Sequence, residues 1–289
     1  MPNVLPETLS PLQYGTVINL MSLAIAVLGA AAIFLFRASG IGVKQRPAML
    51  VSGLVCAIAT YHYSRIMGSW EHAYALNIAA GTYHATGIPF NGFYRYADWI
   101  ITVPLLMVEL IAVLVLPVGK SGPLFAKLAI AAFLMIGLGY PGEVSASPAV
   151  IWTFFALSMI PFLYILYVLF VELNASLQLQ PPAARGLIRV ARTGTLIAWS
   201  FYPIAYVVGK SSIGSGSAEV FLQAGYTVAD IVAKAGFGLL IYFIARVHAN
   251  VETDGGSLLP ETNFEASSLV VRDEWGDIGQ SPVGRGKKC

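Results

Sequence analysis

Ionisable side chains interrupt two apolar stretches of this sequence at positions where they could do chemistry. The segment "RYADWIITVPLLMVE" begins at Arg95 and holds two carboxylates, Asp98 and Glu109. Further along, "YTVADIVAKAGFGLL" holds Asp230 and Lys234 four residues apart. If these stretches span a membrane, each charge is costly, and such residues mark a functional site by default.

The spacing of the first group suits the movement of a proton. On a helix, Asp98, Thr102 and Glu109 lie within about 40° of one another, and Arg95 lies about one turn before Asp98. Asp98 and Glu109 are roughly 16 Å apart along the helix axis. They therefore occupy separate environments, in which two carboxyl groups can hold protons with different affinities.

Lys234 is the matching group on the last apolar stretch. A lysine this deep cannot easily extend to an interface, so it must be paired, neutral or covalently modified. A desolvated lysine amine is also the usual partner in a Schiff base. With a protonated imine on Lys234, the charges of Lys234, Arg95, Asp98 and Asp230 sum to zero, as a low-dielectric site requires.

Two interpretations of these charges stay open from the residues alone. In the first, Asp230 and Lys234 form a structural ion pair and Glu109 lies near a membrane interface. In the second, the charges mark the ion pathway of a transporter. Aromatic residues favour a ligand site, because Trp99 and the sixth-stretch segment "WSFYPIAY" could wall a slot for a long apolar molecule. That segment supplies Trp199, Tyr202, Pro203 and Tyr206. Taken alone, such a group of aromatic residues is more often core packing, because aromatic residues dominate protein cores.

The composition supports the membrane assumption. Of 289 residues, 57% are apolar and only 11% are charged, which is too apolar for an ordinary soluble domain. About 20 mostly apolar residues span a bilayer, and seven stretches qualify or nearly do: 15–36, 47–68, 94–117, 123–140, 148–173, 186–209 and 218–246. The sequence predicts an all-α, seven-helix membrane protein in the lipid bilayer.

The connections predict topology and domain limits. Arginine and lysine gather in alternate connections, so the N-terminus is expected outside and the C-terminus in the cytoplasm of a cell-membrane protein. The connection after the second helix has two short runs flanking "AAG", which predicts a small β-hairpin over the outer mouth. We expect one membrane domain over residues 1–250 and a polar, disordered cytoplasmic tail over 251–289.

Other classes of function are disfavoured. A net charge of +2 provides no basic surface, so nucleic acid is not an expected partner. Cys56 and Cys289 are the two cysteines, and they offer neither a disulfide framework nor a metal cluster. No metal site is expected.

The segments "RYADWIITVPLL", "WSFYPIAY" and "DIVAKAGFG" occur in this order, and with them the chain resembles the microbial rhodopsins over roughly residues 12–248. It looks most like outward proton pumps of the proteorhodopsin and xanthorhodopsin type. The resemblance implies all-trans retinal bound as a Schiff base to Lys234, with Asp98 as proton acceptor and Asp230 as second counterion. Glu109 matches the cytoplasmic proton donor, and Arg95 the outer gate.

The resemblance also implies roles for further residues. Thr102 completes the triad Asp, Thr, Glu that is typical of proton pumps. His62, in "YHYSRIMG", takes the place of a histidine that hydrogen-bonds the acceptor. Met135 and Gly139, together with the aromatic pair Phe154 and Phe155, match positions that line the retinal pocket. Leu106 occupies the tuning position at which leucine accompanies green absorption.

Two positions depart from particular relatives. Phe155, another pocket position, stands where carotenoid-binding members carry a glycine, which argues against a carotenoid antenna. Leu222 replaces one of the paired glutamates that release protons in bacteriorhodopsin, although Glu219 lies nearby. We therefore expect proton release late in the cycle. By resemblance, the protein forms a homo-oligomer, either a pentamer or a hexamer.

The resemblance makes the chain an ion transporter with a bound chromophore, without enzymatic turnover of a substrate. The main alternative is a photosensor that signals through a membrane partner or the tail. Sensors commonly lack an acid at the position of Glu109, so this residue favours the pump. A light-gated channel is disfavoured because no row of further acids lines a continuous pore.

Overall fold

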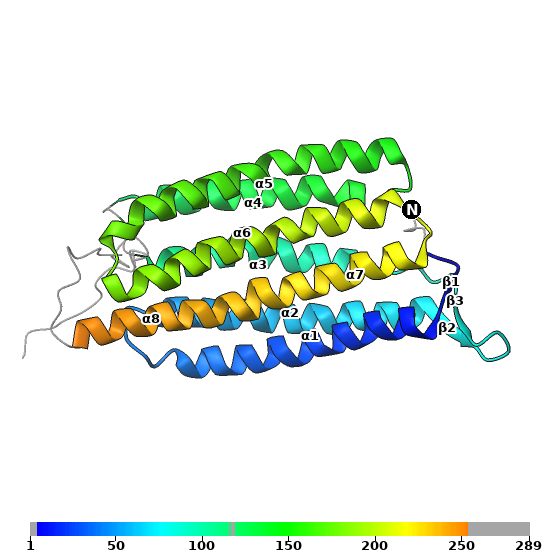
Figure 1. Ribbon diagram of the computed structural model, residues 1–289, viewed down its shortest axis with the longest axis horizontal. Coiled ribbons are helices and arrows are strands. Elements are labelled where there is room, and N and C mark those ends of the chain that lie inside the picture. The colour runs from blue at the N-terminus through cyan, green and yellow to red at the C-terminus, as the bar shows by residue number, and fades with distance from the viewer. Residues whose placement is uncertain (1–4, 115, 117–118, 254–289) are drawn as a thin grey trace, which may run out of the picture.

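The computed structural model describes residues 5–114, 116 and 119–253. Seven long helical segments run side by side in it, and a small sheet caps one end (Figure 1). The first six are α1 (Pro11–Ala38), α2 (Arg46–Ala73), α3 (Phe93–Val113), α4 (Ser121–Glu143), α5 (Pro148–Ser176) and α6 (Pro182–Ser211). The seventh is a continuous helix made of α7 (Gly216–Asp230), the π-helix η2 (Ile231–Gly236) and α8 (Phe237–Thr253). A short 3-10 turn, η1 (Leu177–Leu179), follows α5.

This arrangement confirms the predicted seven-helix bundle. Several helices begin with proline, which loses no hydrogen bond at the first position of a helix. Pro11, Pro148 and Pro182 are the first residues of α1, α5 and α6. Ser10 also caps α1, because its hydroxyl accepts from the backbone of Gln13 while the side chain of Gln13 accepts from the backbone of Ser10.

Most helices extend a few residues beyond their predicted limits, and α2 ends at Ala73 where residue 68 was expected, whereas α3 is shorter than predicted. α3 ends at Val113, although the apolar stretch was expected to continue as helix to residue 117. α8 continues to Thr253, beyond the predicted limit of the membrane domain. The remainder of the predicted tail, 254–289, lies outside the described residues.

The predicted hairpin between α2 and α3 is confirmed. β2 (Tyr74–Asn77) pairs antiparallel with β3 (Thr82–Ala85). A third strand, β1 (Thr8–Leu9), joins the other edge of β3 and was not predicted. The rings of Tyr14 and Tyr83 stack at 3.8 Å between centroids and attach this sheet to the start of α1.

The bundle buries its charged side chains within a largely apolar interior and exposes large apolar side chains on its outside, as expected for a protein in lipid. Buried polar side chains include Arg95, Asp98, Glu109, Asp230 and Lys234, whereas large apolar side chains on α1, α4, α5 and α6 are exposed. By length and composition, four segments are apolar enough to cross a membrane: Pro11–Ala38, Ser121–Glu143, Pro148–Val171 and Gly216–Thr253.

Candidate functional site

The centre of the site is the amine of Lys234, which lies between two carboxylates. Nζ of Lys234 donates a hydrogen bond to Oδ2 of Asp98 on α3 and lies 3.1 Å from Oδ1 of Asp230 on α7. None of the three residues is more than 2% exposed. The structure therefore brings the two predicted segments together. Lys234 belongs to η2, and π-helical turns are rare and occur frequently at functional sites.

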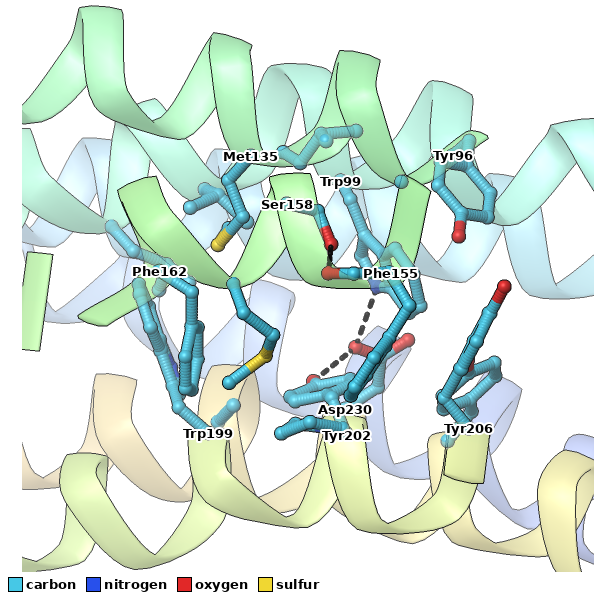
Figure 2. A pocket seen from close by; sticks show the side chains of 18 of the residues that line it. Tyr96, Trp99, Met135, Phe155, Ser158, Phe162, Trp199, Tyr202, Tyr206 and Asp230 are labelled. Carbon is cyan, nitrogen blue, oxygen red and sulfur yellow. Dashed lines mark hydrogen bonds between the residues drawn. The ribbon is translucent and has the colours of Figure 1, made fainter. Parts of the chain in front are cut away.

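Asp230 is held by several hydrogen bonds. The hydroxyl of Tyr63 donates to Oδ2 at 2.7 Å, while Oδ1 accepts from Tyr202 at 2.5 Å and from the indole of Trp99 at 3.0 Å. Figure 2 shows Trp99 and Tyr202 converging on this carboxylate. Hydrogen bonds of this kind stabilise the ionised form of a carboxyl group. Asp230 is thus suited to remain charged.

Asp98 has fewer partners than Asp230. Its Oδ2 atom accepts from Lys234, but Oδ1 has no hydrogen-bond partner among the described residues. Thr102, expected beside it, donates to the backbone carbonyl of Asp98 at 2.9 Å. Asp98 is therefore the carboxylate with capacity to accept a proton from the amine.

His62 lies near Asp98 without the hydrogen bond that the resemblance implies. Nδ1 of His62 is 3.8 Å from Oδ1 of Asp98, which is too long for a direct hydrogen bond. The same nitrogen is 3.0 Å from the backbone carbonyl of Ile58, one turn earlier in α2. That carbonyl competes with the carboxylate for Nδ1.

Arg95 and Glu109 lie on opposite sides of the central charges. Arg95 is directed to the end that carries the sheet, where Nη1 donates to Oε1 of Gln223 at 2.7 Å. Glu109 is fully buried towards the other end, and neither of its oxygens has a hydrogen-bond partner among the described residues. Ser52 of α2 is a polar neighbour of Glu109. Glu109 is thus an isolated acid beyond the central cluster.

A pocket lined mainly by aromatic and apolar side chains extends from Lys234. Nine of the residues expected in it line the pocket: Trp99, Leu106, Met135, Gly139, Phe155, Trp199, Tyr202, Pro203 and Tyr206. Phe154, which was also expected there, is not among the lining residues. Figure 2 shows Trp199 and Phe162 towards one side of this pocket and Tyr96 and Tyr206 towards the other. The ring of Phe155 stacks on Tyr206 at 5.2 Å between centroids. The slot and its terminal amine fit a long apolar aldehyde bound as an imine.

Several residues of the site were not predicted. Tyr63 and Gln223 contact the central charges. The further residues that line the pocket are Tyr96, Val103, Ile136, Ser158, Met159, Phe162, Tyr226 and Ala233. Nothing in the sequence alone indicates that Gln223 turns towards Arg95. Tyr63 directly follows His62, and this position next to a predicted residue was the available signal.

Comparison with known proteins identifies the family of the chain. The family model for bacteriorhodopsin-like proteins matches residues 15–247. The green-light absorbing proteorhodopsin of Gamma-proteobacterium EBAC31A08 is 30% identical over 221 residues, which is 76% of this chain and 82% of that protein. Bacteriorhodopsin of Halobacterium salinarum is 32% identical over 232 residues, 76% of this chain and 80% of that protein.

Two solved structures are similar throughout the bundle. Xanthorhodopsin, described as a light-driven ion pump with dual chromophore, is 47% identical with a TM-score of 0.80, covering 86% of this chain and 99% of that chain. Thermophilic rhodopsin is 44% identical with a TM-score of 0.81 and the same coverage of 86% and 99%. The chain belongs to the bacteriorhodopsin-like family and is a microbial rhodopsin of the proton-pump type.

Proposed function

We propose that the protein exports protons when it is illuminated, with retinal bound to Lys234. The observation that carries this proposal is the difference between the two aspartates beside Nζ of Lys234. Asp230 has its acceptor atoms occupied, whereas Asp98 has a free oxygen and a direct contact with the amine. Proton-pumping relatives of similar length support the same conclusion.

Each residue then has a distinct task. Lys234 holds retinal through Nζ, and retinal supplies absorption of visible light and a change of shape by isomerisation. Asp98 takes the proton from Nζ, which removes the charge pair at the centre. Glu109 then returns a proton to Nζ from the other side and is refilled from the cytoplasm. Asp230 stays ionised and, with Arg95, keeps the site neutral.

The distribution of positive charge supports export. At the end opposite the sheet, the helix termini and connections carry Arg37, Lys44, Arg46, Lys120, Lys127, Arg185, Arg189 and Arg192. At the sheet end they carry Arg65 and Lys210. The positive-inside rule places the sheet outside the cell. Asp98 is nearer to this outer end than Glu109, so the proposed direction is outward.

Three further properties belong to this proposal. Leu106 lines the pocket and supports green absorption, as in the green-light absorbing relative. Phe155 fills the pocket wall against Tyr206, which supports a single chromophore without a carotenoid antenna. The exposed apolar surface of the helices supports lipid contact, and we infer a pentamer or hexamer from family resemblance.

The pH of an unbuffered suspension of cells that express the protein with added retinal tests the proposed function. Under green light, we expect acidification of the medium that a protonophore abolishes. Cells expressing Lys234→Ala are the matched control, and they should remain colourless and show no response. Coloured wild-type cells that produce no pH change would exclude net transport and favour the sensor interpretation.

A further inference from the structure

A chain of hydrogen bonds leads from Arg95 towards the end of the bundle that carries the sheet. Nη1 of Arg95 donates to Oε1 of Gln223 at 2.7 Å, and Nε2 of Gln223 donates to Oε1 of Glu219 at 2.9 Å. Gln223 is only 1% exposed, and its backbone carbonyl accepts from Thr227 one turn later. A single buried amide thus connects the guanidinium group on α3 to a carboxyl group in the first turn of α7.

Glu219 lies where this chain reaches the surface. Its side chain lines a hollow that is also lined by Lys210, Ser145, Ser212 and Ser215. Ser212 and Ser215 belong to the exposed connection between α6 and α7, whereas Glu219 itself is partly buried. A proton on Glu219 therefore has a short path to water.

The charges around Glu219 indicate that its carboxyl group is neutral at rest. Lys234 and Arg95 balance Asp98 and Asp230 at the centre. Lys210 lies 3.5 Å from a carboxylate oxygen of Glu143, which is 3% exposed. In the described part of the chain, Glu219 forms no ion pair of its own.

The other groups that face Glu219 do not change this balance. They are Arg95 from α3, Glu143 from α4, Lys210 from α6 and the hydroxyl of Tyr74 from β2. The two cations among them already have carboxylate counterparts, and tyrosine is neutral near pH 7. A negative Glu219 would leave an unmatched charge in a partly buried position, which is unfavourable.

We propose that Glu219 holds the proton that leaves the protein on the outer side, and that Gln223 couples its discharge to Arg95. This inference rests on the proposed function and adds an exit site to it. Gln223 is a positioning residue, because it acts through the groups that it holds.

The proton balance over one cycle is as follows. Asp98 takes the proton from Nζ of Lys234 and becomes neutral, so Arg95 is attracted less strongly to the centre. Through Gln223, the positive charge of Arg95 then favours the ionised form of Glu219 more strongly. Glu219 therefore gives its proton to water in the hollow. Later Asp98 returns its proton to Glu219, while Glu109 refills Nζ and takes one proton from the cytoplasm. One proton crosses the membrane.

The timing of release distinguishes this scheme from the sequence-based expectation. Without the paired glutamates of bacteriorhodopsin, we expected release late in the cycle. A protonated Glu219 that is discharged through Arg95 instead releases its proton when Asp98 becomes protonated. A purely structural contact between Gln223 and Glu219 would have no effect on this timing.

Flash experiments on purified protein in nanodiscs test the order of events. A pH-sensitive dye reports proton release, and the infrared carbonyl band of protonated Asp98 reports its occupancy. In the wild type, we expect the dye signal to rise together with the Asp98 band. In Glu219→Gln, the early dye signal should be lost, and protons should appear only as the Asp98 band decays.

Two further variants make the test specific. Gln223→Met keeps the side-chain length and removes both hydrogen bonds, so it should delay release although Glu219 is intact. Glu71→Gln removes an exposed carboxylate near the C-terminal end of α2, next to the sheet, and should leave the timing of proton release unchanged. Each variant is compared only if its absorption spectrum and thermal stability match those of the wild type.

The outcomes separate this inference from the proposed function. Wild-type protein that pumps under continuous light but releases protons only as the Asp98 band decays would contradict the exit site alone. Early release that persists in Glu219→Gln would also contradict it, and unchanged timing in Gln223→Met would reject the coupling. Failure of the wild type to pump under continuous light would overturn the proposed function, and this inference with it.

Discussion

At the residue scale, the two aspartates beside Lys234 differ in their hydrogen bonds and therefore in their expected tasks. Asp98→Asn removes the carboxylate with the free oxygen while keeping its shape. We expect this variant to form a coloured pigment but to lose at least about 99% of its transport, since a positioned proton acceptor contributes roughly 10²-fold or more. Initial rates of light-driven acidification measure the loss. Asp98→Glu is the control, and it should retain part of the activity because it keeps a carboxyl group.

Glu109 is buried, and its carboxyl oxygens have no hydrogen-bond partner in the part of the chain that the structure describes, as suits an acid that keeps its proton until a base appears. In Glu109→Gln, we expect recovery of the dark state to slow by about 10²-fold, because an internal donor is lost. Flash photolysis measures this rate. Added azide, a small weak acid that carries protons, should accelerate the variant much more than the wild type. A recovery rate equal to that of the wild type would remove Glu109 from the mechanism and favour the sensor.

Tyr63 stabilises the charge on Asp230. Tyr63→Phe removes the hydroxyl that donates to Oδ2 at 2.7 Å. A hydrogen bond to a charged group contributes about 1.5–3 kcal/mol, so we expect the free energy of unfolding to fall by that amount. Thermal loss of colour in nanodiscs measures the change. Tyr164→Phe is the matched control, because Tyr164 is 43% exposed on the lipid-facing side of α5. Equal stability of the two variants would contradict the assigned role.

The central residues could be predicted because charges in an apolar stretch have few structural explanations. Lys234, Asp98 and Asp230 lie together for this reason. Their neutral partners could not be predicted in the same way. Tyr61 and Tyr63 are equally plausible from sequence, yet Tyr61 is 59% exposed and Tyr63 is fully buried. Helix rotation about its axis decides between them, and apolar residues on all sides of a membrane helix leave that rotation undetermined.

At the element scale, the π-helix η2 could not be predicted from the sequence. Its residues, Ile231–Gly236, are ordinary apolar helix formers apart from Lys234 and the final glycine. The wider turn contains Lys234, whose side chain lies between Asp98 and Asp230. The four-residue spacing alone predicted that Asp230 and Lys234 lie on one helical face and form a pair. It could not predict that the turn between them is π-helical.

Two glycines in α6 differ in what surrounds them. A Cβ atom on Gly209 would lie 2.7 Å from Cβ of Leu222, whereas one on Gly194 would meet nothing within 4 Å. We expect Gly209→Ala to destabilise the protein by about 1–3 kcal/mol through overpacking against α7. Gly194→Ala should stabilise it by about 0.5–1 kcal/mol through helix propensity. Thermal unfolding of both variants in nanodiscs tests this, and effects of equal sign would contradict close packing of α6 on α7.

At the scale of the whole molecule, hydropathy was enough to predict seven helices, and two short runs flanking "AAG" predicted the hairpin between α2 and α3. The third strand could not be predicted, because β1 has only two residues and its partner His84 lies 76 positions after Thr8. Such pairing depends on the bundle, which brings the start of α1 close to the connection after α2. The sheet therefore closes one end through a contact that appears only after folding.

Orientation in the membrane is the remaining property of the whole molecule, and two exposed loop positions report it. Ile78 in the hairpin and Val43 between α1 and α2 are both 88% exposed and lie at opposite ends of the bundle. In a Cys289→Ser background, in which Cys56 is buried, a membrane-impermeant maleimide added to intact cells should label Ile78→Cys. It should label Val43→Cys only after the membrane is opened. The reverse pattern would place the sheet in the cytoplasm, and the same residues would then move protons inward.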